Sequence, residues 1–174
     1  MAKIPFTKLQ LKKINESKEF TYNEQIITVK QYLPIADKLA LIGRVINAAS
    51  DEYNFANPVK LDMYLSLEIV FTYTNLSFTE KQKEDIGKLY DLLEENNIIS
   101  KVIELLPEEE YRTLWEGVVE LADNIYAYQT SVLGILDTVN RDYQDLDLDA
   151  QKIQKELNDP DNMALLRSVL TKLG

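Results

Sequence analysis

Four acidic residues in the last third of the chain have the spacing of a calcium-binding loop. Asp145, Asp147 and Asp149 alternate with leucine, and Glu156 follows eleven residues after Asp145. Oxygen ligands at positions one, three, five and twelve of a loop surround Ca²⁺ in EF-hands. The sixth position is Ala150, where such a loop needs glycine for a turn with positive φ. We therefore favour an acidic linker whose last aspartate caps the next helix, with calcium as the alternative.

A second acidic cluster, Glu108 to Glu110, directly follows Pro107. Three adjacent carboxylates suit a metal site or acid–base chemistry, but acids in the first turn of a helix are also stabilised by the helix dipole. The proline favours this second interpretation, because it is tolerated where a helix begins. The five glycines are scattered or terminal, so no phosphate-binding loop can be assembled from them.

The composition removes most catalytic chemistry. The 174 residues include no histidine and no cysteine. The usual general base near neutral pH, the thiolate nucleophile and most transition-metal ligands are therefore missing together. We expect a protein that is not an enzyme, that needs no cofactor, and that acts by binding other macromolecules.

The charge is acidic overall but unevenly placed. The net charge is −10, while residues 1–31 carry six lysines and three glutamates, which leaves −13 on the remaining residues. An acidic surface disfavours direct binding to nucleic acid or to an anionic membrane. The first residues form no signal peptide, and no window approaches the roughly 20 apolar residues of a membrane span. We expect a cytoplasmic protein. The basic first segment is either a solvated lysine-rich edge, which is the interpretation we favour, or a surface complementary to the acidic body of a second subunit in a homo-oligomer.

The first third of the chain predicts a β-hairpin followed by helices. Residues 20–22 and 25–32 are rich in β-branched and aromatic side chains and flank Asn23-Glu24, as in two strands joined by a tight turn. Residues 4–11 are a candidate third strand. Pro34 is typical of a helix start. We divide the chain into a hairpin segment, 1–33, and a helical domain, 34–174.

Three further helices are predicted before residue 107. Asn57-Pro58 is an N-cap followed by proline, and residues 59–73 are apolar on nearly every side, which is typical of a central helix. A buried strand over residues 67–73 is the competing interpretation. Thr79 and Gln82 have capping-box spacing, which predicts a helix to about residue 95, and a short helix covers residues 98–106.

A heptad seam dominates the region from residue 107 to residue 143. Its apolar positions alternate spacings of four and three, which predicts one helix roughly 50 Å long. The single polar member, Gln129, either fixes register or lies at an edge. The seam consists of Tyr111, Trp115, Val118, Ala122, Ile125, Gln129, Val132, Leu136, Val139 and Tyr143.

A last amphipathic helix is predicted at the carboxyl end, after Asp159-Pro160-Asp161. Its apolar residues need either the chain's own core or a partner to cover them. Tyrosines such as Tyr128 either give this helix an aromatic surface of the kind found in interfaces or line the rim of an ordinary core with their hydroxyls in water. We predict that a partner binds the seam and the face formed by Met163, Leu166, Leu170 and Leu173. The predicted fold class is mainly α, a helical bundle with one long heptad-patterned helix after a small N-terminal hairpin or short antiparallel sheet.

The order of these features resembles small tail-region proteins of tailed bacteriophages of Gram-positive bacteria. The resemblance rests on the opening lysines (Lys3, Lys8, Lys12, Lys13), on residues 27–34 (ITVKQYLP), on 78–85 (FTEKQKED) and on 165–174. Tail assembly chaperones often begin in this way. The resemblance implies a non-enzymatic phage assembly or structural protein that binds a virion protein, such as a tail or tape-measure protein, in the cytoplasm of the host bacterium or within the virion.

A different class of function also fits the charge. An acidic phage-encoded inhibitor or regulator would bind a host enzyme, with its carboxylates mimicking nucleic acid. Mimicry predicts carboxylates in a stripe on one face and salt-sensitive binding to a basic protein, whereas assembly predicts an apolar patch that is buried in an oligomer. A hydrolase with paired carboxylates is a third class.

Overall fold

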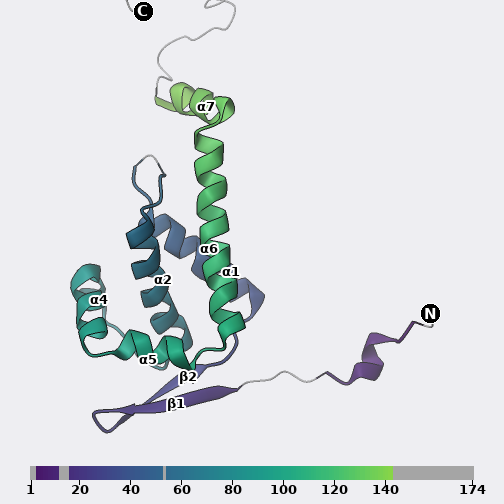
Figure 1. The fold of residues 1–174 in the computed structure, drawn as a ribbon, viewed down its shortest axis with the longest axis vertical. Coiled ribbons are helices and arrows are strands. Elements are labelled where there is room, and N and C mark those ends of the chain that lie inside the picture. Colours follow the sequence, from purple (N-terminus) through teal and green to yellow (C-terminus); the bar gives the residue numbers. More distant parts are fainter. Residues whose placement is uncertain (1–2, 12–15, 53, 143–174) are drawn as a thin grey trace, which may run out of the picture. The chain divides into compact units, whose positions relative to one another are not determined.

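The computed structural model describes residues 3–11, 16–52 and 54–142. Within them it is mainly helical, with a two-stranded antiparallel sheet near the N-terminus, as the sequence predicts (Figure 1). By its internal contacts the chain divides into two compact units, residues 1–126 and residues 127–174.

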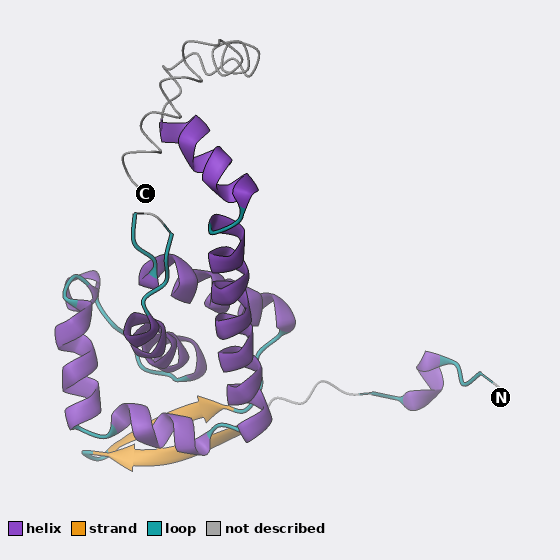
Figure 2. Ribbon diagram, turned by 45° about the horizontal axis from the view of Figure 1, so that its top comes forward, coloured by secondary structure: helices purple, strands orange, loops and turns teal. Residues whose placement is uncertain are grey.

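The hairpin is formed by β1 (Ser17–Tyr22) and β2 (Gln25–Lys30). Asn23 and Glu24 form the turn, and both have positive φ, 46° and 64°, as a two-residue turn requires. Val29 on β2 is fully buried. The hairpin therefore contributes to the same core as the helices of the first unit. Both Figure 1 and Figure 2 show it lying beside α5 (Ile98–Leu105).

The predicted third strand is wrong. Residues Phe6–Leu9 form a short 3-10 helix, η1, and the sheet has only β1 and β2 among the described residues. Pro5 precedes this turn and Gln10 ends it in a left-handed conformation, with φ of 49°. A proline fixes φ and lacks an N–H, so it favours a turn over the middle of a strand.

Helices α1 (Ile35–Ala49) and α2 (Pro58–Tyr73) begin where the sequence predicts. The Asn57 side chain accepts hydrogen bonds from the N–H groups of Val59 and Lys60, so it caps α2. Helix α2 packs against both α1 and α5, and it is buried on several sides. It is the central helix of the first unit, and the competing strand over residues 67–73 is wrong.

The predicted third helix is interrupted. The capping box at Thr79 and Gln82 is present, but it starts only α3 (Glu80–Lys83). A new helix, α4 (Ile86–Glu95), begins after Asp85, whose carboxylate accepts from the N–H of Lys88. The Asp85 side chain satisfies a free N–H group at the start of α4. A new helix can therefore begin there, and the helix that starts at Glu80 does not continue.

The long seam helix is also two helices. Helix α6 (Glu108–Gln129) ends before Thr130, and α7 (Val132–Asp142) follows. The Ser131 hydroxyl accepts from the N–H of Gly134 and donates to the Tyr128 carbonyl, so it caps α7. A Cβ at Gly134 would lie only 2.2 Å from the Tyr128 carbonyl oxygen, so this turn requires glycine. Heptad spacing carries no signal for such a local cap, and the prediction of one continuous helix is wrong.

The core of the first unit joins the hairpin, α1, α2, α4, α5 and the first half of α6. Its fully buried large side chains are Val29, Leu41, Val45, Leu65, Leu67, Ile69, Val70, Tyr73, Val102, Leu114 and Val118. No helix in the described ranges is both long and apolar enough to cross a membrane.

Candidate functional site

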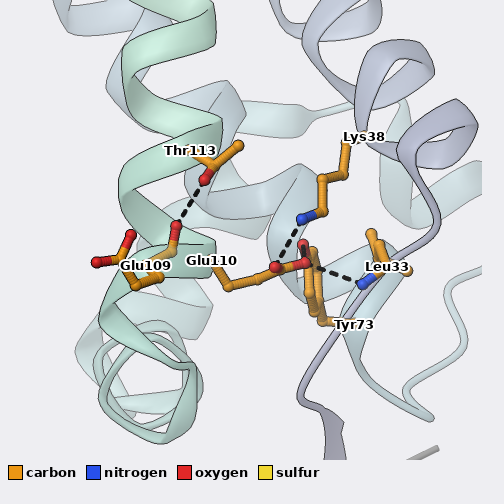
Figure 3. Close-up of polar contacts among 6 residues, drawn as sticks. All are labelled: Leu33, Lys38, Tyr73, Glu109, Glu110 and Thr113. Atoms are coloured by element: carbon orange, nitrogen blue, oxygen red, sulfur yellow. Dashed lines mark hydrogen bonds and ion pairs between the residues drawn. The ribbon is translucent and has the colours of Figure 1, made fainter. Parts of the chain in front are cut away.

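A buried carboxylate is the most concentrated polar feature of the first unit. Glu110, in the first turn of α6, points into the core and is 6% exposed. It accepts hydrogen bonds from the Lys38 ammonium at 2.6 Å, the Tyr73 hydroxyl at 2.8 Å and the Leu33 N–H at 2.9 Å (Figure 3). These groups come from α1, α2 and the segment after β2, so one side chain ties three elements to α6.

The electrostatics of this cluster favour a closed structural contact. Burial, followed by the hydrogen bond to Glu110, raises the pKa of the Tyr73 hydroxyl far above its usual range. The hydroxyl therefore stays protonated and keeps donating. Both oxygens of Glu110 are occupied by protein donors, and Lys38 and Tyr73 are buried. A catalytic acid or base needs access to a substrate proton, and this cluster has no such access.

The prediction that Glu108 to Glu110 are first-turn acids is correct for their position. It missed that Glu110 faces inward, whereas Glu109 is exposed and contacts Arg112. A signal existed in the sequence: Glu110, Leu114 and Val118 are spaced by four, so they lie on one face of the helix.

A groove of about 730 Å³ lies between α1, α2 and the α3–α4 region. Its walls carry a guanidinium, an ammonium, one carboxylate and several apolar side chains. The Glu68 carboxylate is held by Arg44, with the closest contact at 2.7 Å. The lining includes no second carboxylate, so the groove offers no acid–base pair. Its chief lining residues are Arg44, Tyr64, Leu67, Glu68, Phe71 and Lys83.

A smaller, shallow groove of about 440 Å³ lies on one face of α6, and all its lining residues belong to that helix. It combines two apolar side chains, Trp115 and Val119, with three carboxylates, those of Glu116, Glu120 and Asp123. Trp115 is 36% exposed. The side chains that line this groove suit a peptide segment that is apolar and also carries positive charge.

The second unit presents an apolar surface on α7. Val132 and Leu133 are 74% and 71% exposed, and Ile135 and Leu136 are each 53% exposed. We call these four residues the α7 apolar face. Four large aliphatic side chains exposed within five residues are far more than the isolated exposed leucines that are normal on a protein surface.

The structure divides the predicted seam between buried and exposed positions. Val118 is buried, Tyr111, Ala122, Ile125, Gln129 and Val139 are half-buried, and Trp115, Val132 and Leu136 are exposed. The buried face of α6 runs through Glu110, Leu114 and Val118. The predicted seam does not include Leu133 or the acidic side of the α6 groove, because the heptad pattern selects apolar residues at alternating spacings of four and three.

Tyr128, also predicted to bind a partner, is 50% exposed. The other predicted site residues lie outside the described residues. They are Tyr143, the calcium candidates Asp145, Asp147, Asp149 and Glu156, and the terminal-helix residues Met163, Leu166, Leu170 and Leu173. In the described part of the chain, no group of three or more acidic, histidine or cysteine side chains could hold a metal ion.

Comparison of the chain with protein-family models, with curated proteins and with solved structures finds no match. The resemblance to phage tail-region proteins therefore stays a prediction made from the sequence.

Proposed function

We propose that this protein is a non-enzymatic phage assembly or structural protein, similar to a tail assembly chaperone, that binds another virion protein. The observation that carries the proposal is the α7 apolar face, whose four side chains are 53–74% exposed. Covering them would remove apolar area from water at about 25 cal/mol per Å². A helical partner with its own apolar stripe, such as a tape-measure protein, is suited to that surface.

The lack of histidine and cysteine supports a binding role over catalysis. Within the described ranges, the strongly buried charged cluster at Glu110 joins structural elements and is closed to substrates. We therefore place the activity on exposed surfaces, in the cytoplasm of an infected bacterium, with or without incorporation into the virion.

The alternative, an acidic inhibitor of a host enzyme, has one observation in its favour. Glu116, Glu120 and Asp123 are exposed on the same side of α6, so part of the acidic charge is arranged along one face. Such an arrangement could meet a basic surface on a host protein, and its binding would weaken steeply with salt.

The two functions are distinguished by capture of the tagged full-length chain from phage-producing cells, followed by mass spectrometry. Assembly predicts a tail or tape-measure protein in the wild-type capture and its loss when Leu133 and Leu136 are both replaced by lysine. Recovery of a host enzyme alone, lost instead when Glu120 and Asp123 are replaced by lysine, would support the inhibitor and contradict assembly.

A further inference from the structure

The N-terminal segment, residues 3–11, exposes apolar side chains beside positive charge. Ile4, Phe6, Leu9 and Leu11 are 52–74% exposed, and Lys3 and Lys8 are exposed as well. Residues three apart lie on the same side of a 3-10 helix, so Phe6 and Leu9 form one apolar face of η1. We call residues 3–11 the arm.

The groove on α6 has the complementary composition. Trp115 and Val119 are one turn apart and form its apolar part, and Glu120 and Asp123 lie beside them. Among residues 3–11, 16–52 and 54–142, the nearest ion pair on this side of α6 is the one between Arg112 and Glu116, and none involves Glu120 or Asp123. Two carboxylates are therefore available for cations from outside the described unit.

The dimensions of the two surfaces agree. Phe6 and Leu9 are separated by about 6 Å along a 3-10 helix, at roughly 2.0 Å per residue. Trp115 and Val119 are separated by about 6 Å along α6, at 1.5 Å per residue. An arm laid on the groove can thus pair its two apolar residues with the two of α6, while its lysines lie near the carboxylates.

We propose that the arm of one copy binds the α6 groove of a second copy, so that the protein self-associates by exchanging arms. The arm suits the groove because it can supply both apolar contacts and the opposite charge. Two-fold exchange forms the same contact twice and leaves no groove open. The inference does not depend on the virion partner or on the α7 apolar face.

The occupant of the groove is the arm of a second copy, because two-fold exchange covers both arms and both grooves at once. Binding of the arm to the groove of its own chain is the outcome that the second test below distinguishes.

The first test is sedimentation velocity of the full-length chain over a range of concentrations. We expect a dimer that dissociates on dilution. Charge reversal in the arm (Lys3→Glu with Lys8→Glu) or in the groove (Glu120→Lys with Asp123→Lys) is expected to weaken dimerisation at least tenfold, and combining all four changes is expected to restore most of it. The matched controls, Lys60→Glu with Lys88→Glu and Glu94→Lys with Glu95→Lys, change the net charge equally at exposed sites elsewhere.

The second test uses the absence of native cysteine. One chain carries Phe6→Cys, a second chain of different size carries Val119→Cys, and the two are mixed and oxidised. We expect a disulfide between the two sizes. A third chain with both changes, oxidised when dilute, reports the intramolecular contact. A monomer at every concentration, no rescue by the combined reversals, or a disulfide only within the doubly substituted chain would overturn the proposal.

Discussion

The Glu110 carboxylate lies 2.6 Å from the Lys38 ammonium, across 72 positions of sequence, and both side chains are buried. The same carboxylate accepts from the Tyr73 hydroxyl and from the Leu33 N–H. Its position matters more for stability than that of any exposed ion pair in the described residues, because removing one partner leaves the other charge buried and uncompensated.

Replacing Glu110 with glutamine is expected to lower the free energy of unfolding by about 3–5 kcal/mol, because the Lys38 ammonium loses its counter-charge in the core. Urea unfolding followed by circular dichroism measures the change. Glu109→Gln is the matched control, since that side chain is 77% exposed and contacts only Arg112 among the ion pairs described. Its cost should stay within about 1 kcal/mol. Equal costs for the two variants would show that the buried pair is not a major source of stability.

Adding Lys38→Met to Glu110→Gln should recover part of that loss, since the uncompensated charge is removed as well. A double-mutant cycle over the four proteins measures the coupling between the two residues. The interpretation fails if the two single costs simply add.

Tyr73 should make stability depend on pH in alkaline solution. Its pKa in the folded chain is raised, first by burial and then by the hydrogen bond to Glu110, whereas an unfolded tyrosine titrates at about 10. Below pH 10 both states hold the proton. As the pH rises above 10 the unfolded state loses it first, so the stability contributed by neutral Tyr73 is lost at about 1.4 kcal/mol per pH unit.

Tyr73→Phe tests this dependence. At pH 8 the variant is expected to be less stable by about 1.5–3 kcal/mol, because a hydrogen bond to a carboxylate is lost. Between pH 10 and pH 11 its deficit relative to the wild type should shrink by about 1 kcal/mol, because the unfolded tyrosine is only half titrated at pH 10. Urea midpoints at each pH measure both quantities, and Tyr126→Phe, at an exposed side chain, is the control. A deficit that stays constant over this pH range would contradict the assignment.

Gly117 marks the close approach of α6 to α1. A Cβ at this position would lie 2.7 Å from the Ile42 Cδ1 atom, whereas a Cβ at Gly43 meets nothing within 4 Å. Gly43→Ala is expected to stabilise the protein by about 0.5–1 kcal/mol through helix propensity. Gly117→Ala should gain less than Gly43→Ala or lose stability, because overpacking costs about 1–3 kcal/mol.

Shortening the neighbour tests whether that contact is the cause. In an Ile42→Val background the Cδ1 atom is absent, so Gly117→Ala should there approach the gain of Gly43→Ala. Thermal and urea unfolding of the single and double variants provide the comparison. If the difference in stability between the two alanine variants is the same in the Ile42→Val background as in the wild type, the contact does not explain that difference.

Replacing Leu133 and Leu136 with lysine should remove partner binding without unfolding the chain. Both side chains are more than half exposed, so their substitution is expected to change stability by no more than about 0.5 kcal/mol. Leu39→Lys with Leu92→Lys changes two equally exposed leucines of the first unit and is the matched control. If the proposed assembly function is correct, capture of a tail or tape-measure protein should be lost only with the α7 variant. Its loss with both variants would argue against a specific α7 surface.

The hairpin and the helix starts could be predicted because their signals are local. Asn23-Glu24 favours a tight turn, Pro34 is tolerated where α1 begins, and Asn57 can cap only the helix that follows it. The signals for the helix breaks at Asp85 and Ser131 are also local. Each cap lies inside a continuous apolar pattern that predicts an unbroken helix, so both breaks were missed from the sequence.

The site could be predicted only in part. The sequence identified an apolar, tyrosine-rich region from residue 111 onward, and Trp115, Val132 and Leu136 are indeed exposed there. The sequence could not show which of these side chains are exposed and which are buried, because exposure depends on which neighbours pack against α6 and α7. Val118, a member of the same seam, is fully buried.

By itself, the sequence determined the mainly helical fold with its hairpin, the charge difference between the first 31 residues and the rest, and the lack of histidine and cysteine. Those properties depend on residue type and short-range spacing. Only the tertiary structure decided that Glu110 pairs with Lys38, that Gly117 faces Ile42, and that Trp115 borders a groove. Each of these contacts joins residues or surfaces that local propensity does not relate, and packing alone brings them together.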